Sequence, residues 1–98
     1  MTEAASLNIV RLSFEENLKW DLYYRGIKIS ARIIDPSFYL RIDNGEAFSK
    51  GDVLEVELQI NQYFDDAVNT FITKSYQVNT INRHILRNEQ QKFDFDAD

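Results

Sequence analysis

The stretch Trp20–Ile33, WDLYYRGIKISARI, determines the fold more than any other part of the sequence. Apolar and polar residues alternate on both sides of Arg25-Gly26, as they do in two half-buried strands joined by a tight turn. The predicted register pairs Tyr24 with Ile27, Leu22 with Ile29, Trp20 with Ala31, Tyr23 with Lys28, Asp21 with Ser30, and Lys19 with Arg32. Every apolar residue except Tyr23 then lies on one side, and a one-residue slip would destroy that arrangement. Because arginine is unusual at the first loop position, a bulged turn with Gly26 in the left-handed conformation is the alternative.

The flanking segments predict three more strands and one short helix. A strand is expected over Leu7–Phe14, and a long alternating strand over Leu54–Ile60. The last strand, from about Phe71 to Ile81, loses its alternation near Asn79-Thr80, where a β-bulge is expected.

The helix has signals at both ends. Asp35-Pro36 provides an N-cap residue followed by a proline at the first helical position. Phe38 and Ile42 share a face, and Gly45 stands where a left-handed residue ends a helix.

This order predicts a mainly β fold: a small five-stranded antiparallel barrel or roll, OB-like or SH3-like, with its helix between strands three and four. The predicted core contains Trp20, Leu22, Ile29, Leu54, Val56, Leu58 and Val78. We expect a flexible N-terminus over residues 1–6, one domain over 7–87 and an acidic mobile tail over 88–98.

Composition narrows the class of protein. The chain has 98 residues, 44% of them hydrophobic, which suits one globular domain. It contains no cysteine, no basic and apolar leader, and no run of apolar residues long enough to span a membrane, so a cytoplasmic location is expected. The formal charge of −5 comes mostly from the tail, so the domain lacks the strong basic character of a nucleic-acid-binding protein.

No group of residues predicts catalysis, a metal site or a cofactor. Glu55 and Glu57 share one face of a strand, which is usually solvated. The oxygens of Asp65, Asp66 and Asn69 fit a turn better than a calcium loop. His84 is the only histidine, so we expect a structural role and no enzyme activity.

The best candidate binding residues are Lys19, Tyr23, Lys28 and Arg32, with Arg41 as a further cation. The hairpin register places the first four on one outward face, where an aromatic ring lies among cations. Proteins that bind single-stranded nucleic acid use this mixture, although an ordinary solvated sheet face is the simpler interpretation.

Several short runs resemble a β module found at the C-terminal ends of otherwise unrelated, uncharacterised bacterial and prophage-borne proteins. They are Gly26–Ala31, Asp35 with Phe38, Phe48–Leu54, Gln62 and Tyr76–Val78. The resemblance covers most of the chain and implies no activity. It implies that these residues can form part of a longer protein.

The sequence therefore favours a non-enzymatic interaction module that binds a protein partner or a neighbouring domain, without a membrane. The alternative is a weak OB-type binder of single-stranded nucleic acid. The sequence leaves the oligomeric state open.

Overall fold

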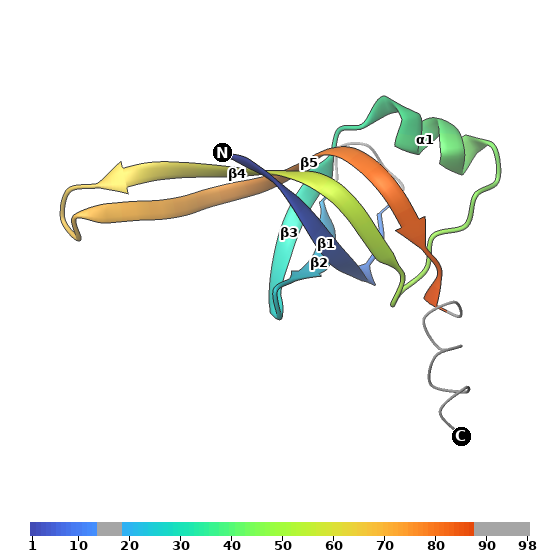
Figure 1. The fold of residues 1–98 in the computed structure, drawn as a ribbon, viewed down its shortest axis with the longest axis horizontal. Coiled ribbons are helices and arrows are strands. Elements are labelled where there is room, and N and C mark those ends of the chain that lie inside the picture. Colours follow the sequence, from blue (N-terminus) through green and yellow to red (C-terminus); the bar gives the residue numbers. More distant parts are fainter. Residues whose placement is uncertain (14–18, 88–98) are drawn as a thin grey trace, which may run out of the picture.

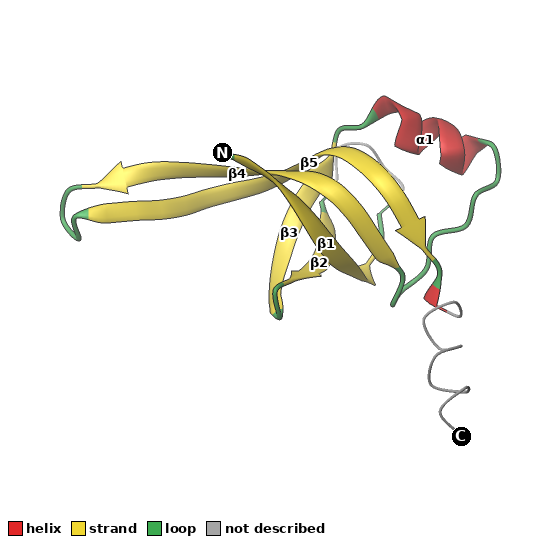
Figure 2. Cartoon of the chain, viewed as in Figure 1, coloured by secondary structure: helices red, strands yellow, loops and turns green. Residues whose placement is uncertain are grey.

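The computed structural model describes residues 1–13 and 19–87 and shows a small closed β-barrel. Figure 1 shows its elements and Figure 2 how strongly strands predominate. The elements are β1 (Thr2–Arg11), β2 (Trp20–Tyr24), β3 (Ile27–Ile33), α1 (Pro36–Asp43), β4 (Val53–Asp65) and β5 (Thr70–Ile85). The predicted tail over 88–98 and the residue Phe14 lie outside the described residues.

The barrel has the strand order β1-β2-β3-β5-β4 and closes where β4 pairs with β1. The predicted five strands and the helix between strands three and four are confirmed. One pairing corrects the prediction of a purely antiparallel sheet, because β3 and β5 run parallel. The connection through α1 crosses the barrel before the β4–β5 hairpin begins, so β5 returns alongside β3 in the same direction.

The predicted hairpin register is confirmed from Trp20–Ala31 to Tyr24–Ile27. Arg25 and Gly26 have φ values of 51° and 78°, so both loop residues are left-handed. Two positive φ values define a type I′ turn, whose twist matches that of the two strands. The turn therefore has two residues and does not use the bulged alternative.

The helix α1 has the predicted caps. The side chain of Asp35 accepts a hydrogen bond from the main-chain N–H of Ser37, and Pro36 begins the helix. Gly45 follows the helix with a φ of 93°. Phe38, the fully buried residue of the helix, packs against the barrel and fixes the position of α1.

The first strand begins earlier than predicted. Residues 1–6 are predicted to be flexible, but Thr2–Ser6 pair with β4, from Gln59 back to Glu55. The long strand β4 provides a complete edge for this pairing, which needs main-chain groups and not large apolar side chains. The strand thus starts at Thr2 and not at Leu7.

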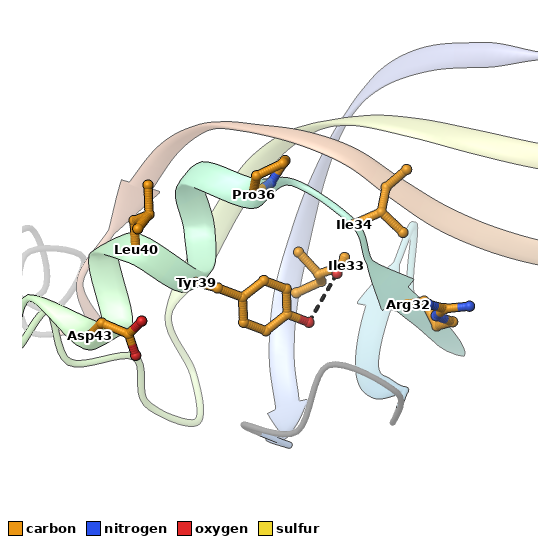
Figure 3. Close-up of a pocket in the computed structure, with 7 residues that line it drawn as sticks. All are labelled: Arg32, Ile33, Ile34, Pro36, Tyr39, Leu40 and Asp43. Atoms are coloured by element: carbon orange, nitrogen blue, oxygen red, sulfur yellow. Dashed lines mark hydrogen bonds between the residues drawn. The ribbon is translucent and has the colours of Figure 1, made fainter.

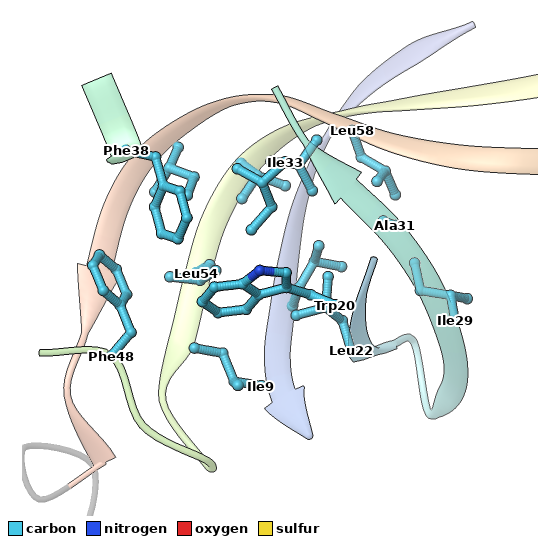
Figure 4. Packing of buried hydrophobic residues seen from close by; sticks show 14 of the residues in the cluster. Ile9, Trp20, Leu22, Ile29, Ala31, Ile33, Phe38, Phe48, Leu54 and Leu58 are labelled. Atoms are coloured by element: carbon cyan, nitrogen blue, oxygen red, sulfur yellow. The ribbon is translucent and has the colours of Figure 1, made fainter. Parts of the chain in front are cut away.

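All seven predicted core residues are buried in one cluster, shown in part in Figure 4. Trp20 lies at its centre, with its ring edge-on to Phe38 at 5.2 Å and to Phe48 at 6.4 Å between centroids. The helix and the loop before β4 thus complete the core that the strands begin.

The last two strands are long. The bulge expected near Asn79-Thr80 is present, since the register with β4 shifts between Thr80 and Val78. β5 ends at Ile85, beyond the predicted Ile81, because further bulges let it follow β4 as far as Val53. At the other end, residues 61–75 of this hairpin extend away from the barrel (Figure 1); we call this segment the arm.

Candidate functional site

The four predicted binding residues lie together on the outer face of the β2–β3 hairpin. Tyr23 and Lys28 are directly opposite each other, and Tyr23 is 46% exposed. Lys19 and Arg32 are also exposed and adjoin Trp20 and Ala31, where the observed register ends, so the predicted Lys19–Arg32 pair is not part of the strand pairing. The predicted cluster is therefore brought together, with its aromatic ring open to solvent.

Two further residues complete this face: Asp21, which the predicted register already places there, and Arg11, which no sequence pattern predicts. Asp21 lies on it and accepts a hydrogen bond from the Ser30 hydroxyl at 2.8 Å. The Nε of Arg11, on β1, lies 3.0 Å from the Asp21 carboxylate. A register shift between Ile9 and Arg11 brings Arg11 beside Asp21, and nothing in the sequence periodicity predicts that shift.

The cationic face, as we use the term, consists of Arg11, Lys19, Tyr23, Lys28 and Arg32. Asp21, the acidic residue within it, is already paired with Arg11. Arg41 is not part of this face, because it lies on the helix α1. Its guanidinium makes two hydrogen bonds of 2.8 Å to the Glu46 carboxylate. The face can therefore bind an anionic or aromatic group with several cations around a single ring.

A shallow pocket of about 450 Å³ lies beyond Arg32, between the end of β3 and the helix α1 (Figure 3). The Tyr39 hydroxyl donates a 2.9 Å hydrogen bond to the carbonyl oxygen of Ile33 across it. Ile34 and Leu40 are exposed at its rim. The pocket thus extends the cationic face with apolar surface and one carboxylate, that of Asp43.

The arm exposes large apolar side chains on both of its faces. Phe64 and Phe71 lie opposite each other, 48% and 65% exposed, with ring centroids 5.3 Å apart. Tyr63, on the other face, is 49% exposed, and Val68 in the connecting loop is 58% exposed. No one-sided pattern in the sequence marks these residues as a binding surface, although three aromatics beside a predicted hairpin connection are a usable signal.

The loop at the tip of the arm is built by ordinary turn chemistry. The carboxylate of Asp65 accepts a hydrogen bond from the N–H of Ala67 at 2.9 Å, and Asn69 has a left-handed φ of 54°. Over residues 1–13 and 19–87, no three histidine, aspartate or glutamate side chains form a group suited to a metal ion.

His84 has a structural position. Its Nε2 lies 2.8 Å from the Asp52 carboxylate and its Nδ1 lies 2.9 Å from that of Glu46. The ring stacks on Phe48 at 4.2 Å between centroids, and the side chain is 4% exposed. Through these contacts His84, on β5, holds the loop between α1 and β4 in place.

Asp52 is held by several donors in addition to His84. The main-chain N–H groups of Ser49 and Arg87 donate to its carboxylate at 2.9 and 2.8 Å. Burial alone raises the pKa of Asp52, but the hydrogen bonds from His84, Arg87 and Ser49 outweigh it and lower the pKa below its usual value. This carboxylate is a structural anchor with its oxygens already occupied.

Comparisons with protein-family models, with curated proteins and with solved structures gave no match for this chain. No helix within the described part of the chain is long and apolar enough to cross a membrane. The fold and the exposed surfaces thus define the molecule as a small closed β-barrel with a cationic face and an apolar arm.

Proposed function

We propose that this domain is a non-enzymatic interaction module that binds a protein partner, or a neighbouring domain of a larger polypeptide, through the arm. The observation behind this proposal is the exposure of Tyr63, Phe64 and Phe71 on a hairpin that projects from the barrel. Aromatic side chains are enriched at the centres of protein interfaces, where they contribute much of the binding energy.

The arm has no role in the barrel core. The buried cluster ends at Ile60 on β4, with Tyr76 packed against it on β5. Residues that neither fill the core nor close the barrel are free to be selected for contact with another molecule, and exposed apolar patches mark such contacts.

Affinity capture from the cells that make this protein, with partners identified by mass spectrometry, tests the proposal. The double variant Phe64→Ser, Phe71→Ser should lose a partner that the wild-type chain retains. The matched control is Tyr23→Ala, Arg11→Ala on the cationic face, away from the arm, which should retain it. Both variants should keep the wild-type melting temperature within a few degrees, because the replaced side chains are exposed. A partner lost only by the control variant, or by neither, would contradict binding through the arm.

We further propose that the barrel is OB-like and that the protein is bacterial and cytoplasmic. Support for an OB-like barrel comes from the five strands and from the helix between β3 and β4. Support for the cytoplasm comes from the absence of cysteine in the sequence. The resemblance of short runs to a module of bacterial and prophage-borne proteins supports a bacterial source.

The cationic face supports one alternative, a weak OB-type binder of single-stranded nucleic acid. Tyr23 can stack on a base while the four cations of the face, Arg11, Lys19, Lys28 and Arg32, lie near phosphates. Neutralising about four phosphates predicts a slope of log K against log salt of about −3. Gel shift with labelled single strands at low salt measures this slope. Absence of a shift, or a shift unchanged by Tyr23→Ala with Arg32→Ala, removes the alternative.

A further inference from the structure

Strands β3 and β5 separate at one point of the barrel. We call the region between Ile27–Ser30 of β3 and the arm part of β5 the fork. β3 pairs with β5 only where Ala31–Ile33 meet Tyr76–Val78. Before this point β5 runs in the arm, while Ile27–Ser30 of β3 continue down the β2–β3 hairpin (Figure 1). Among the described residues, no strand pairs with Ile27–Ser30 on the side that faces the arm.

The geometry of the hairpin identifies the main-chain groups that face the fork. Tyr24 and Ile27 flank a two-residue turn, so their main-chain groups bond to each other. Bonded and non-bonded pairs alternate along antiparallel strands. The main-chain groups of Ile29 therefore bond to β2. The main-chain N–H and C=O of Lys28 and the main-chain N–H of Ser30 point into the fork instead.

The opposite side of the fork is less suitable for pairing. The register of β5 shifts between Ser75 and Thr73, so Lys74 is a bulge residue. A bulge interrupts the regular spacing of edge groups and protects an edge from pairing. The edge of β3 is therefore the regular one of the two.

The two sides of this edge differ in chemistry. The inner side continues the core and is apolar: Ile27 is 65% exposed there. Phe64 follows the buried Ile60 by four residues along β4, so it also lies on the inner side, and Phe71 lies opposite it. The outer side presents Lys28 and Arg32. Glu3 on the inner side accepts a hydrogen bond from the Tyr24 hydroxyl and pairs with Arg25, so its charge is compensated.

We infer that the free edge of β3 binds an extended segment of a partner protein in which apolar and acidic residues alternate. The main chain of the segment pairs with Lys28 and Ser30 and adds a strand to the sheet. Its apolar side chains then cover Ile27 on the inner side, and its carboxylates meet Lys28 and Arg32 on the outer side. This inference rests on the proposed function in one respect, that the domain binds a protein partner, and it specifies the chemistry of that partner.

The probe is a blocked synthetic peptide, Val-Asp-Val-Asp-Val-Asp, added to the full chain. Amide hydrogen exchange measured by NMR should slow at Lys28 and Ser30, while the amides of Ile27 and Ile29, already paired with β2, should change little. The control peptide Val-Val-Val-Asp-Asp-Asp has the same composition without the alternation and should bind at least about tenfold more weakly, a difference of about 1.4 kcal/mol.

Charge is tested with a matched pair of variants. Lys28→Glu places a like charge beside the peptide and should weaken binding about tenfold or more. Lys50→Glu, in the exposed turn before β4, makes the same charge change away from the fork and should leave binding unchanged.

The inference would be wrong if the alternating peptide did not bind, or if both peptides bound equally well. It would also be wrong if the amides of Lys28 and Ser30 exchanged slowly in a dimer without peptide, because the edge would then be paired with a second copy of the chain. If the peptide fails while the arm variant still loses its partner, the proposed function stands and only the edge site is wrong. If the peptide binds and the arm variant loses no partner, the edge site stands and the arm is wrong.

Discussion

The single histidine gives the clearest prediction for one residue. His84 bridges the carboxylates of Asp52 and Glu46, and the Asp52 side chain is only 3% exposed. Removing the hydrogen-bond partner of a buried carboxylate leaves that carboxylate unsatisfied and costs about 1–3 kcal/mol, or more for a charged group. His84→Gln, which cannot reach both carboxylates, should therefore lower the free energy of unfolding by about 3 kcal/mol, measured by urea denaturation.

The neighbouring Arg83 is the control for this variant. Its guanidinium lies 3.8 Å from Glu55, and both side chains are well exposed. Exposed pairs contribute about 0–1 kcal/mol, so Arg83→Ala should have little effect. Equal effects of the two variants would show that His84 is not an anchor.

The hydrogen-bonded carboxylates of Asp35, Glu46 and Asp52 predict the direction of acid denaturation. Hydrogen bonds from Ile81 and Ser37 lower the pKa of Asp35 despite its burial, and those from Arg41 and His84 lower the pKa of Glu46. A carboxyl with a lower pKa in the folded than in the unfolded state stabilises the fold above the unfolded value, about 3.9 for aspartate and 4.3 for glutamate. This stability is lost as pH falls through the folded values.

Urea midpoints measured between pH 7 and pH 3 check this direction. They should be nearly constant down to about pH 5 and then fall steeply below about pH 4. Asp52→Asn should be less stable at pH 7 and should lose less stability in acid. Midpoints that stay constant to pH 3 would contradict the assigned role of these carboxylates.

Core packing gives a second prediction for a single residue. Leu58 is fully buried in the middle of β4. Leu58→Ala should lower the free energy of unfolding by about 2–5 kcal/mol, since it removes buried methyl groups and leaves a cavity. Thermal or urea unfolding measures this, and a loss below about 1 kcal/mol would place the side chain outside the main core.

Among the elements, the arm is separable from the barrel. Gln62 and Thr73 are partners in the β4–β5 pairing, so Asn-Gly can join them in place of residues 63–72. The shortened chain should keep its melting temperature within about 4–8 °C, equivalent to about 1 kcal/mol in a domain of this size. Aggregation or a much larger decrease would show that the arm stabilises the barrel.

The elements also show what sequence patterns can predict. The β2–β3 hairpin was predictable to the residue, because its two strands have period-two patterns and the turn contains a glycine. The start of β1 was not, since Thr2–Ser6 are ordered by main-chain pairing with β4 and contain no large apolar residue. The arm was missed because aromatic residues on both faces of a hairpin produce no one-sided pattern.

In the whole molecule, the barrel closes through two different contacts. Seven residue pairs join β1 to β4, whereas three join β3 to β5. The short parallel contact leaves the fork and directs the arm away from the barrel. Its parallel direction was not predictable, because it depends on the path of the α1 connection and not on any local pattern. The cationic face was predicted from the hairpin register, while Arg11 required the bulge in β1.

Photo-crosslinking from the arm tests the central claim, that the arm is the protein-binding surface. Phe71 is replaced by photoreactive p-benzoylphenylalanine, and the matched control carries the same group at Ala4, an exposed position on β1. In extracts of the source cells, position 71 should form a crosslink to a defined protein. Excess wild-type chain should abolish that crosslink, and excess arm-shortened chain should leave it unchanged. Crosslinks that are equal at positions 4 and 71, or that the arm-shortened chain also abolishes, would contradict the account.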